Sequence, residues 1–300
     1  MRFLFLVLFL ISSLFSLSFD ITNTTIQNGA TTLIEFKKEK DFKYDKITLD
    51  KKNFKIYNHP SDKDKMYALL PISYYQKPSD KLVAIHYVEK GVQKTKLIPL
   101  KIKKGDYKKE KISVTKSKVN PHKKYEKRIS KEYHEAMKIY GSSSKQNYLK
   151  SEFILPIESF ITSDFGKARV YNDTLKGYHS GTDFRAKVGT PIKASNDGVV
   201  CLVKDRFYSG GTVLIDHGQG IYTCYFHMSK FDVKVSQKIK KGEIIGLSGK
   251  SGRVSGPHLH FGVRVAGVQV DPLQFLALMN NKLLCKSTSA LGVLPKETKR

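Results

Sequence analysis

The sequence has no tryptophan and very little cysteine. Only three of the 300 residues are cysteine, at Cys201, Cys224 and Cys285. An odd number at this spacing fits no metal-binding cysteine knuckle, so the cysteines do not predict a zinc site of that kind. Two interpretations of Cys201 and Cys224 stay open: both are small buried apolar residues, or they pair as a disulfide in an oxidising compartment.

Acidic residues are scarce as well. Asp and Glu number 27 against 53 Lys and Arg, which gives a formal net charge of +26. Such a charge attracts nucleic acid, acidic membrane surfaces or acidic wall polymers. Most of the lysines are expected to solvate the surface, and peripheral contact with an anionic envelope polymer is the second interpretation.

One apolar run stands at the start of the chain, and it is too short for a typical membrane span. Residues 3–17 are almost wholly apolar, with small residues at Ser16 and Ser18 for a signal peptidase to read. Residues 1–18 are therefore predicted to be a secretory signal peptide, with an uncleaved anchor helix as the alternative. Export argues against a nucleic-acid partner.

The rest of the chain divides into three regions that differ in composition and in the spacing of their apolar residues. Residues 19–119 alternate short apolar runs with Lys-rich stretches, which predicts a β-sandwich-like N-terminal domain. Residues 120–150 hold apolar residues at helical spacing from Ile129 through Tyr133 and Ala136 to Tyr140. We expect a connecting helix that ends at Gly141 and packs on a neighbour through this stripe.

The remaining part of the chain is rich in glycine, strand-like runs and short turns. This texture predicts a compact antiparallel β domain over residues 151–276, followed by a C-terminal tail at 277–300. The fold class expected for the whole chain is therefore mainly β.

Histidines gather in that domain. Five of the nine lie between His179 and His260, in the segments HSGTD at 179–183 and GPHLHF at 256–261 among others. Side chains two apart on a strand share a face, so His258 and His260 are expected to enter one pocket. Imidazole and carboxylate groups are suitable zinc ligands, and a catalytic zinc usually takes three of them and keeps one position open.

These segments resemble the lysostaphin-type, or LytM-like, zinc metallopeptidases. YHSGTDF at 178–184 looks like the family's His-x-x-x-Asp motif, and GPHLHF looks like its His-x-His motif. The resemblance runs over about residues 153–275, and no position expected to act departs from it. Further matching segments lie at 163–166, 169–172, 189–194, 197–200, 225–229 and 241–246. The first two resemble Gram-negative envelope members, in which a β domain and a helix often precede the peptidase.

The resemblance implies a zinc ion held by His179, Asp183 and His260. It also implies that His227 and His258 are catalytic and stand beside the metal without binding it. One histidine would take a proton from water while the other stabilises the oxyanion or protonates the leaving amine, and the assignment stays open. No His-Glu-x-x-His helix is present, so the base is not the glutamate of that metalloprotease class.

The implied activity is hydrolysis of the peptide cross-links of bacterial peptidoglycan during cell-wall remodelling. The Gram-negative-like layout favours a DD-endopeptidase acting on stem peptides, and DD-carboxypeptidase activity uses the same chemistry. Two alternatives belong to other classes: a non-catalytic LytM-like regulator of another hydrolase, or a basic envelope-binding protein. By analogy, the N-terminal domain is also a candidate gate over the groove.

Other residues have competing interpretations. His217, in an Asp-His-Gly turn, is predicted to be structural. Arg169, Tyr171 and Asn172 either line the substrate groove or support the fold.

Overall fold

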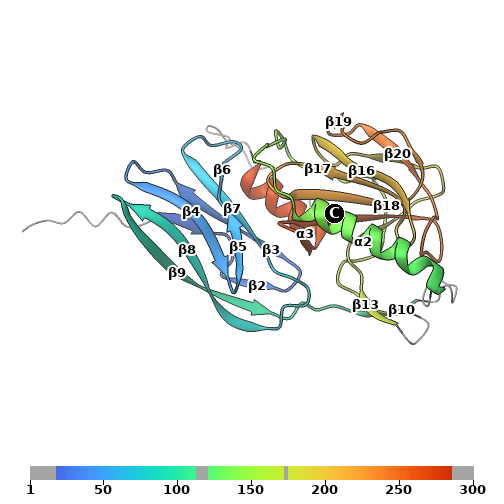
Figure 1. Ribbon diagram of the computed structural model, residues 1–300, viewed down its shortest axis with the longest axis horizontal. Helices are drawn as coiled ribbons and strands as arrows, with labels where there is room; N and C mark the ends of the chain where they lie inside the picture. Colours follow the sequence, from blue (N-terminus) through green and yellow to red (C-terminus); the bar gives the residue numbers. More distant parts are fainter. Residues whose placement is uncertain (1–17, 113–120, 172–174, 286–300) are drawn as a thin grey trace, which may run out of the picture.

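The computed structural model describes residues 18–112, 121–171 and 175–285. It has two β-rich halves, with a long helix on the second (Figure 1). The predicted signal peptide, apart from residue 18, and Asn172 lie outside the described residues. Within the described part of the chain, no helix has the length and apolar character needed to cross a membrane.

The N-terminal half is a β-sandwich, as the sequence predicts. Its two sheets run in the orders β1-β3-β7-β6 and β2-β9-β8-β4-β5. Side chains alternate faces along a strand, so Ile98, Leu100 and Ile102 of β9 are buried between the sheets while their neighbours are exposed. The strands are β1 (Phe19–Ile21), β2 (Thr25–Gln27), β3 (Thr31–Lys37), β4 (Phe42–Leu49), β5 (Lys52–Lys55), β6 (Tyr57–Asn58), β7 (Lys65–Pro71), β8 (Ser79–Glu89) and β9 (Val92–Lys103).

The C-terminal half is built on a ten-stranded sheet. Its main path runs β11-β14-β21-β18-β17-β16-β19, with β15, β20 and β22 paired off this path. All these pairings are antiparallel, which agrees with the predicted antiparallel domain. The strands are β11 (Ile161–Ser163), β14 (Thr182–Arg185), β15 (Pro191–Lys193), β16 (Gly198–Arg206), β17 (Gly210–Asp216), β18 (Ile221–Phe231), β19 (Lys238–Ile239), β20 (Ile244–Ser248), β21 (His258–Val265) and β22 (Val268–Val270).

A small three-stranded sheet links the two halves. Strand β10 (Lys109–Ile112) leaves the sandwich and pairs in parallel with β12 (Ala168–Tyr171), which pairs with β13 (Leu175–Tyr178). Strand β10 was expected to belong wholly to the N-terminal domain, but it pairs with a strand of the C-terminal half.

The connecting helix is present and ends at the expected glycine. A 3-10 turn, η1 (Lys123–Tyr125), leads into α2 (Glu126–Gly141). Ala136 and Tyr140 pack against the sheet with Tyr222 and Cys224. Tyr133 differs from the expected stripe because it is 60% exposed, on the side of the helix that borders a groove.

The predicted tail begins later than expected. Helix α3 (Pro272–Leu278) is capped by Asp271 and continues as a π-helix, η2 (Met279–Leu283). Leu278, Met279 and Leu283 are buried in the main core, so the predicted boundary at residue 276 falls inside a packed helix.

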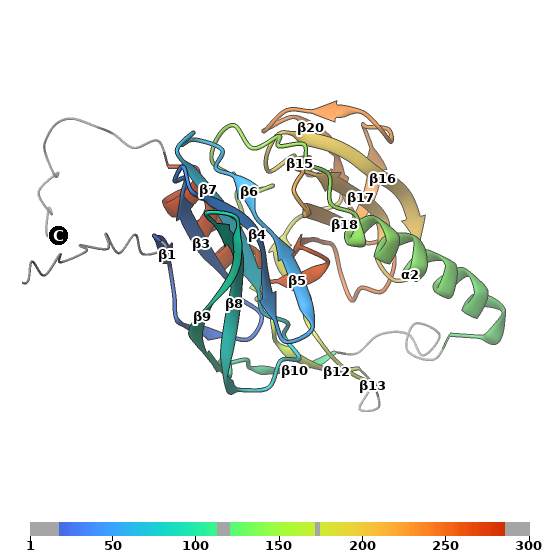
Figure 2. The same ribbon diagram turned by 60° about the vertical axis from the view of Figure 1, so that its left-hand side comes forward.

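Helix α3 also joins the halves. Figures 1 and 2 show it between the sandwich and the ten-stranded sheet. The side chain of Gln274 bonds to both the main-chain nitrogen and the oxygen of Thr31, each at 2.9 Å. Leu33 and Tyr67 of the sandwich belong to the same buried cluster as Phe275, so the two halves share a continuous core.

Candidate metal centre

Three of the predicted residues converge on one point. Asp183 of β14 and His260 of β21 are direct partners in the antiparallel register, which places both side chains on one face. His179, in the segment before β14, reaches the same point. Its Nε2 lies 2.9 Å from Asp183 Oδ1 and 3.0 Å from His260 Nδ1, and the last two atoms are 2.8 Å apart. All three residues are buried.

The donor set fits a metal ion. His179 Nδ1 lies 2.8 Å from the carbonyl oxygen of Asp164, and because a carbonyl only accepts, Nδ1 must carry the hydrogen. In the neutral ring Nε2 is then an acceptor, yet it faces the acceptor oxygen of Asp183. A cation between them resolves this conflict. Two imidazole nitrogens and one carboxylate oxygen are ligands that zinc prefers.

Burial and hydrogen bonding keep the cluster in the form that binds a metal. Burial pulls the pKa of Asp183 upward, but the close contacts of its carboxylate with the imidazoles of His179 and His260 outweigh it and hold that pKa well below its usual range. Burial lowers the pKa of His260 to about 4. At neutral pH the site therefore offers a carboxylate and a neutral imidazole, which metal binding requires.

The two predicted non-ligand histidines stand beside the cluster. His258 Nε2 lies 3.6 Å from Asp183 Oδ1, and the ring of His227 is 6.0 Å from that of His260 between centroids. His227 Nδ1 is 2.9 Å from the carbonyl of Ser251, which fixes the hydrogen on Nδ1 and leaves Nε2 as the acceptor. Burial, with the neighbouring histidine rings, lowers the pKa of His227 well below its ordinary value.

The comparison with known proteins agrees with this arrangement. Residues 177–272 match the model of peptidase family M23. The C-terminal half therefore contains an M23 peptidase domain. This confirms the resemblance to LytM-like metallopeptidases.

Relatives and solved structures extend the comparison. Over 115 residues the chain is 44% identical to the peptidoglycan DD-endopeptidase ShyA of Vibrio cholerae, covering 38% of this chain and 27% of ShyA. It is 40% identical over 95 residues to the DD-carboxypeptidase/endopeptidase Mpg of Neisseria meningitidis, covering 32% of this chain and 22% of Mpg. The chain thus spans about a quarter of the length of these relatives.

One structural likeness reaches beyond the M23 match. A crystal structure from Pseudomonas aeruginosa, assigned to peptidase M23, superposes with a TM-score of 0.63 at 26% identity. The superposition covers 83% of this chain and 93% of the Pseudomonas chain. Because the M23 match begins only at residue 177, this likeness includes much of the N-terminal half.

The cluster opens into a pocket of about 480 Å³. Asp183, His227 and His258 line it, together with Arg169 and the segment 253–257. Arg169 donates from Nη2 to Asp183 Oδ2 at 3.0 Å, so the sequence interpretation that placed it near the groove is correct in position. Tyr171 ends strand β12, and its side chain lies outside the described part of the structure.

Sequence reasoning missed Glu110, which also lines the pocket. It enters on β10, directly opposite Arg169 in the parallel register. No local motif marks this residue, because its place depends on pairing between strands that are far apart in the chain.

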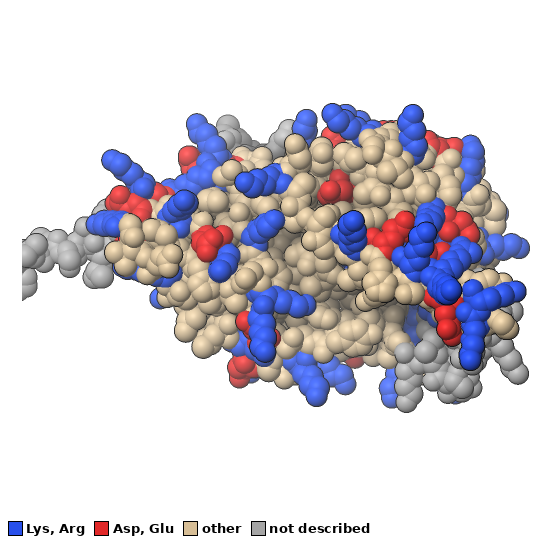
Figure 3. Space-filling model, viewed as in Figure 1, with Lys and Arg blue, Asp and Glu red and all other residues tan. Residues whose placement is uncertain are grey.

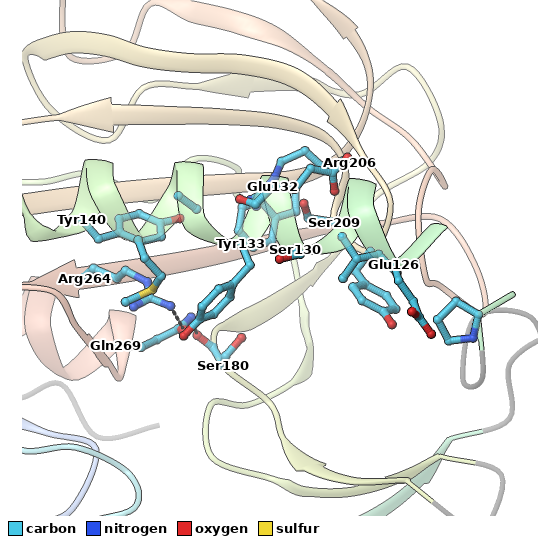
Figure 4. A pocket seen from close by; sticks show the side chains of 16 residues that line it. Glu126, Ser130, Glu132, Tyr133, Tyr140, Ser180, Arg206, Ser209, Arg264 and Gln269 are labelled. Carbon is cyan, nitrogen blue, oxygen red and sulfur yellow. Dashed lines mark hydrogen bonds between the residues drawn. The ribbon is translucent and has the colours of Figure 1, made fainter. Parts of the chain in front are cut away.

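A second groove, of about 660 Å³, runs between α2 and the sheet (Figure 4). Tyr133 reaches from α2 toward Ser180 and Gln269 on the opposite side. Phe226 also lines this groove, and its ring is parallel to that of His260, with ring centroids 5.1 Å apart and planes at 2°. One aromatic ring therefore separates this groove from the metal centre.

The remaining predictions concern structural residues. His217 is fully buried, with Nδ1 2.7 Å from the Asp197 carbonyl and Nε2 2.8 Å from Thr223 Oγ1, which supports the predicted structural role. All three cysteines are free, so Cys201 and Cys224 do not form the alternative disulfide. Cys224 is buried and Cys201 is partly buried, both beside helix α2.

Proposed function

We propose that this protein is a zinc-dependent peptidase that hydrolyses the peptide cross-links of peptidoglycan. The observation that carries the proposal is the convergence of His179 Nε2, Asp183 Oδ1 and His260 Nδ1 on one point, with His227 and His258 beside it. A non-catalytic regulator would not need this complete set, so the catalytic interpretation is favoured.

The chemistry follows from the groups around that point. Zinc held by His179, Asp183 and His260 would polarise the scissile carbonyl and acidify the attacking water. His227 is kept neutral by burial, so its Nε2 is suited to accept the proton of that water. The ring of His258 lies beside that of His227, with centroids 4.8 Å apart, and is suited to stabilise the oxyanion or to protonate the leaving amine.

The proposed substrate is the cross-linked stem peptide. ShyA is named a DD-endopeptidase and Mpg a DD-carboxypeptidase/endopeptidase, and these names support the same bond classes here. One groove lies over Asp183, and a second lies beyond Phe226, whose ring separates it from the metal centre. The printed name of ShyA, which has the higher identity of the two relatives, favours DD-endopeptidase activity as the main reaction.

The proposal places the protein in the periplasm, where peptidoglycan lies and where the predicted signal peptide would send it. Figure 3 shows Lys and Arg side chains spread over both halves of the visible face, with acidic side chains between them. This distribution is typical of a solvated surface, and peripheral contact with anionic envelope polymers is a secondary part of the proposal.

Muropeptide digestion tests the function. Purified protein is incubated with cross-linked dimers and, separately, with pentapeptide monomers, and the products are identified by mass spectrometry. We expect dimers to be split into monomers, and the matched His179→Ala protein to leave them intact. If the parent protein leaves both substrates unchanged while zinc is bound, the proposed activity is wrong.

A further inference from the structure

Strand β10 brings a carboxylate to the metal centre from outside the M23 match. Glu110 Oε2 accepts a hydrogen bond from Arg169 Nε at 3.1 Å and another from Ser163 Oγ at 3.3 Å. Arg169 Nη2 in turn donates to Asp183 Oδ2 at 3.0 Å. Glu110, Arg169 and Asp183 thus form a connected chain of charges, and its first two members precede residue 177, where the match begins.

Backbone pairing fixes this chain of charges. Glu110 lies opposite Arg169 in the parallel β10–β12 register, and Ala168 N donates to the carbonyl of Lys108 at 2.9 Å. The side chain of Arg169 is 14% exposed and that of Glu110 is 29% exposed. Because these groups are largely withdrawn from solvent, their charges are less screened than those of a surface pair.

The two carboxylate oxygens of Asp183 have different partners, and these partners indicate what Glu110 and Arg169 do. Oδ1 faces the two ligand histidines, and Oδ2 is held by Arg169. Arg169 therefore orients the carboxylate but also opposes its negative charge. Glu110 offsets the charge of Arg169, so the three groups together keep one net negative charge beside the place of a divalent ion.

We propose that Glu110 is a positioning residue of the metal centre. Acting through Arg169, it fixes the orientation of Asp183 and preserves the negative charge that favours metal binding. The N-terminal half thereby completes the site of the peptidase domain. This inference rests on the proposed zinc site but not on the proposed substrate.

Zinc affinity of the full mature chain tests it, measured by competition with a chromophoric chelator. Glu110→Gln keeps the shape and removes the charge, and we expect zinc to bind about 10- to 100-fold more weakly, as for other groups that support a metal ligand. Glu110→Asp keeps the charge and should bind more tightly than Glu110→Gln. Glu89→Gln is the matched control, because Glu89 pairs with Lys94 on the sandwich, and should bind as the parent does.

Three outcomes would overturn the proposal. Parental zinc affinity in Glu110→Gln would show that the charge is irrelevant, and equal weakening in Glu110→Asp would show a steric effect only. Parental zinc affinity with faster muropeptide turnover would indicate that β10 restricts access to the pocket.

If Glu110→Gln does not fold by circular dichroism, Arg169→Lys replaces it. A lysine cannot bridge both carboxylates with a planar fork, so weaker zinc binding is expected and parental binding would contradict the proposal.

Discussion

The imidazole rings of His227 and His258 lie 4.8 Å apart between centroids, although they come from different strands, β18 and β21. Each ring holds a main-chain carbonyl through Nδ1 at 2.9 Å, that of Ser251 for His227 and that of Gly256 for His258. Both therefore keep Nε2 available beside the ligand cluster. The two histidines proposed for proton transfer are therefore distinct from the three proposed metal ligands.

Replacing His227 or His258 with alanine should destroy turnover and leave zinc bound. Loss of one proton-transfer or oxyanion partner typically costs ~100- to 10,000-fold in rate. Zinc content and muropeptide turnover are measured on the same preparations. His179→Ala is the contrasting variant and should lose metal and activity together. A folded His227→Ala or His258→Ala protein that lacks zinc would make the replaced residue a ligand, and parental turnover would make it structural.

The metal should be zinc at about one atom per chain, because the cluster offers a single set of three ligands. Chelation should abolish activity and lower the melting temperature, since an ion that binds only the folded chain stabilises it by mass action. Elemental analysis and thermal unfolding before and after chelation provide the measurement. Full activity in a metal-free preparation would contradict this prediction.

Gly181 should be required for the metal centre. A Cβ atom there would lie 2.4 Å from the Phe261 carbonyl oxygen and 2.6 Å from His260 Nε2. Gly181→Ala must therefore shift a strand or the ligand ring, and we expect weaker zinc binding and a loss of stability of ~1–3 kcal/mol. Gly177→Ala is the control, because a Cβ atom at that position would meet nothing within 4 Å. Equal zinc affinity and stability in both variants would refute the steric argument.

The free energy of unfolding should decrease as the pH is lowered, because His217 is buried in its neutral form. Burial lowers its pKa to about 4, so between about pH 6.5 and pH 4 the unfolded chain binds a proton that the folded chain does not. At pH 5 this difference removes about 2 kcal/mol relative to neutral pH. Urea unfolding of metal-free protein at pH 7 and pH 5 measures the loss.

The matched comparison isolates that residue. His217→Gln cannot take the proton and should lose correspondingly less stability over the same pH interval. His134→Gln, on the exposed face of α2, should retain the parental pH dependence. If all three chains lose the same free energy of unfolding, another group is responsible.

Sequence reasoning succeeded where local patterns are sufficient. Strand periodicity predicted the sandwich and the antiparallel domain. The spacing of His258 and His260 predicted that their side chains share one face of a strand, and both rings do approach Asp183 Oδ1, although only His258 lines the pocket. The boundary that the sequence predicts between the peptidase domain and the tail, at residue 276, differs from the structure. Leu278 and Leu283 lie in a segment that the sequence assigns to a tail, and only their contacts with the main core show that the helix continues.

The residues of the proposed metal centre were identified from the sequence, because two short motifs that resemble those of a known peptidase family carry the two histidines and the carboxylate that lie together in the structure. Their surroundings follow only from the packing of the two halves. Glu110 reaches Arg169 through a parallel strand pair, which joins residues 59 apart in the chain. Pairing at that separation depends on how the halves meet, and no local pattern of residues encodes it.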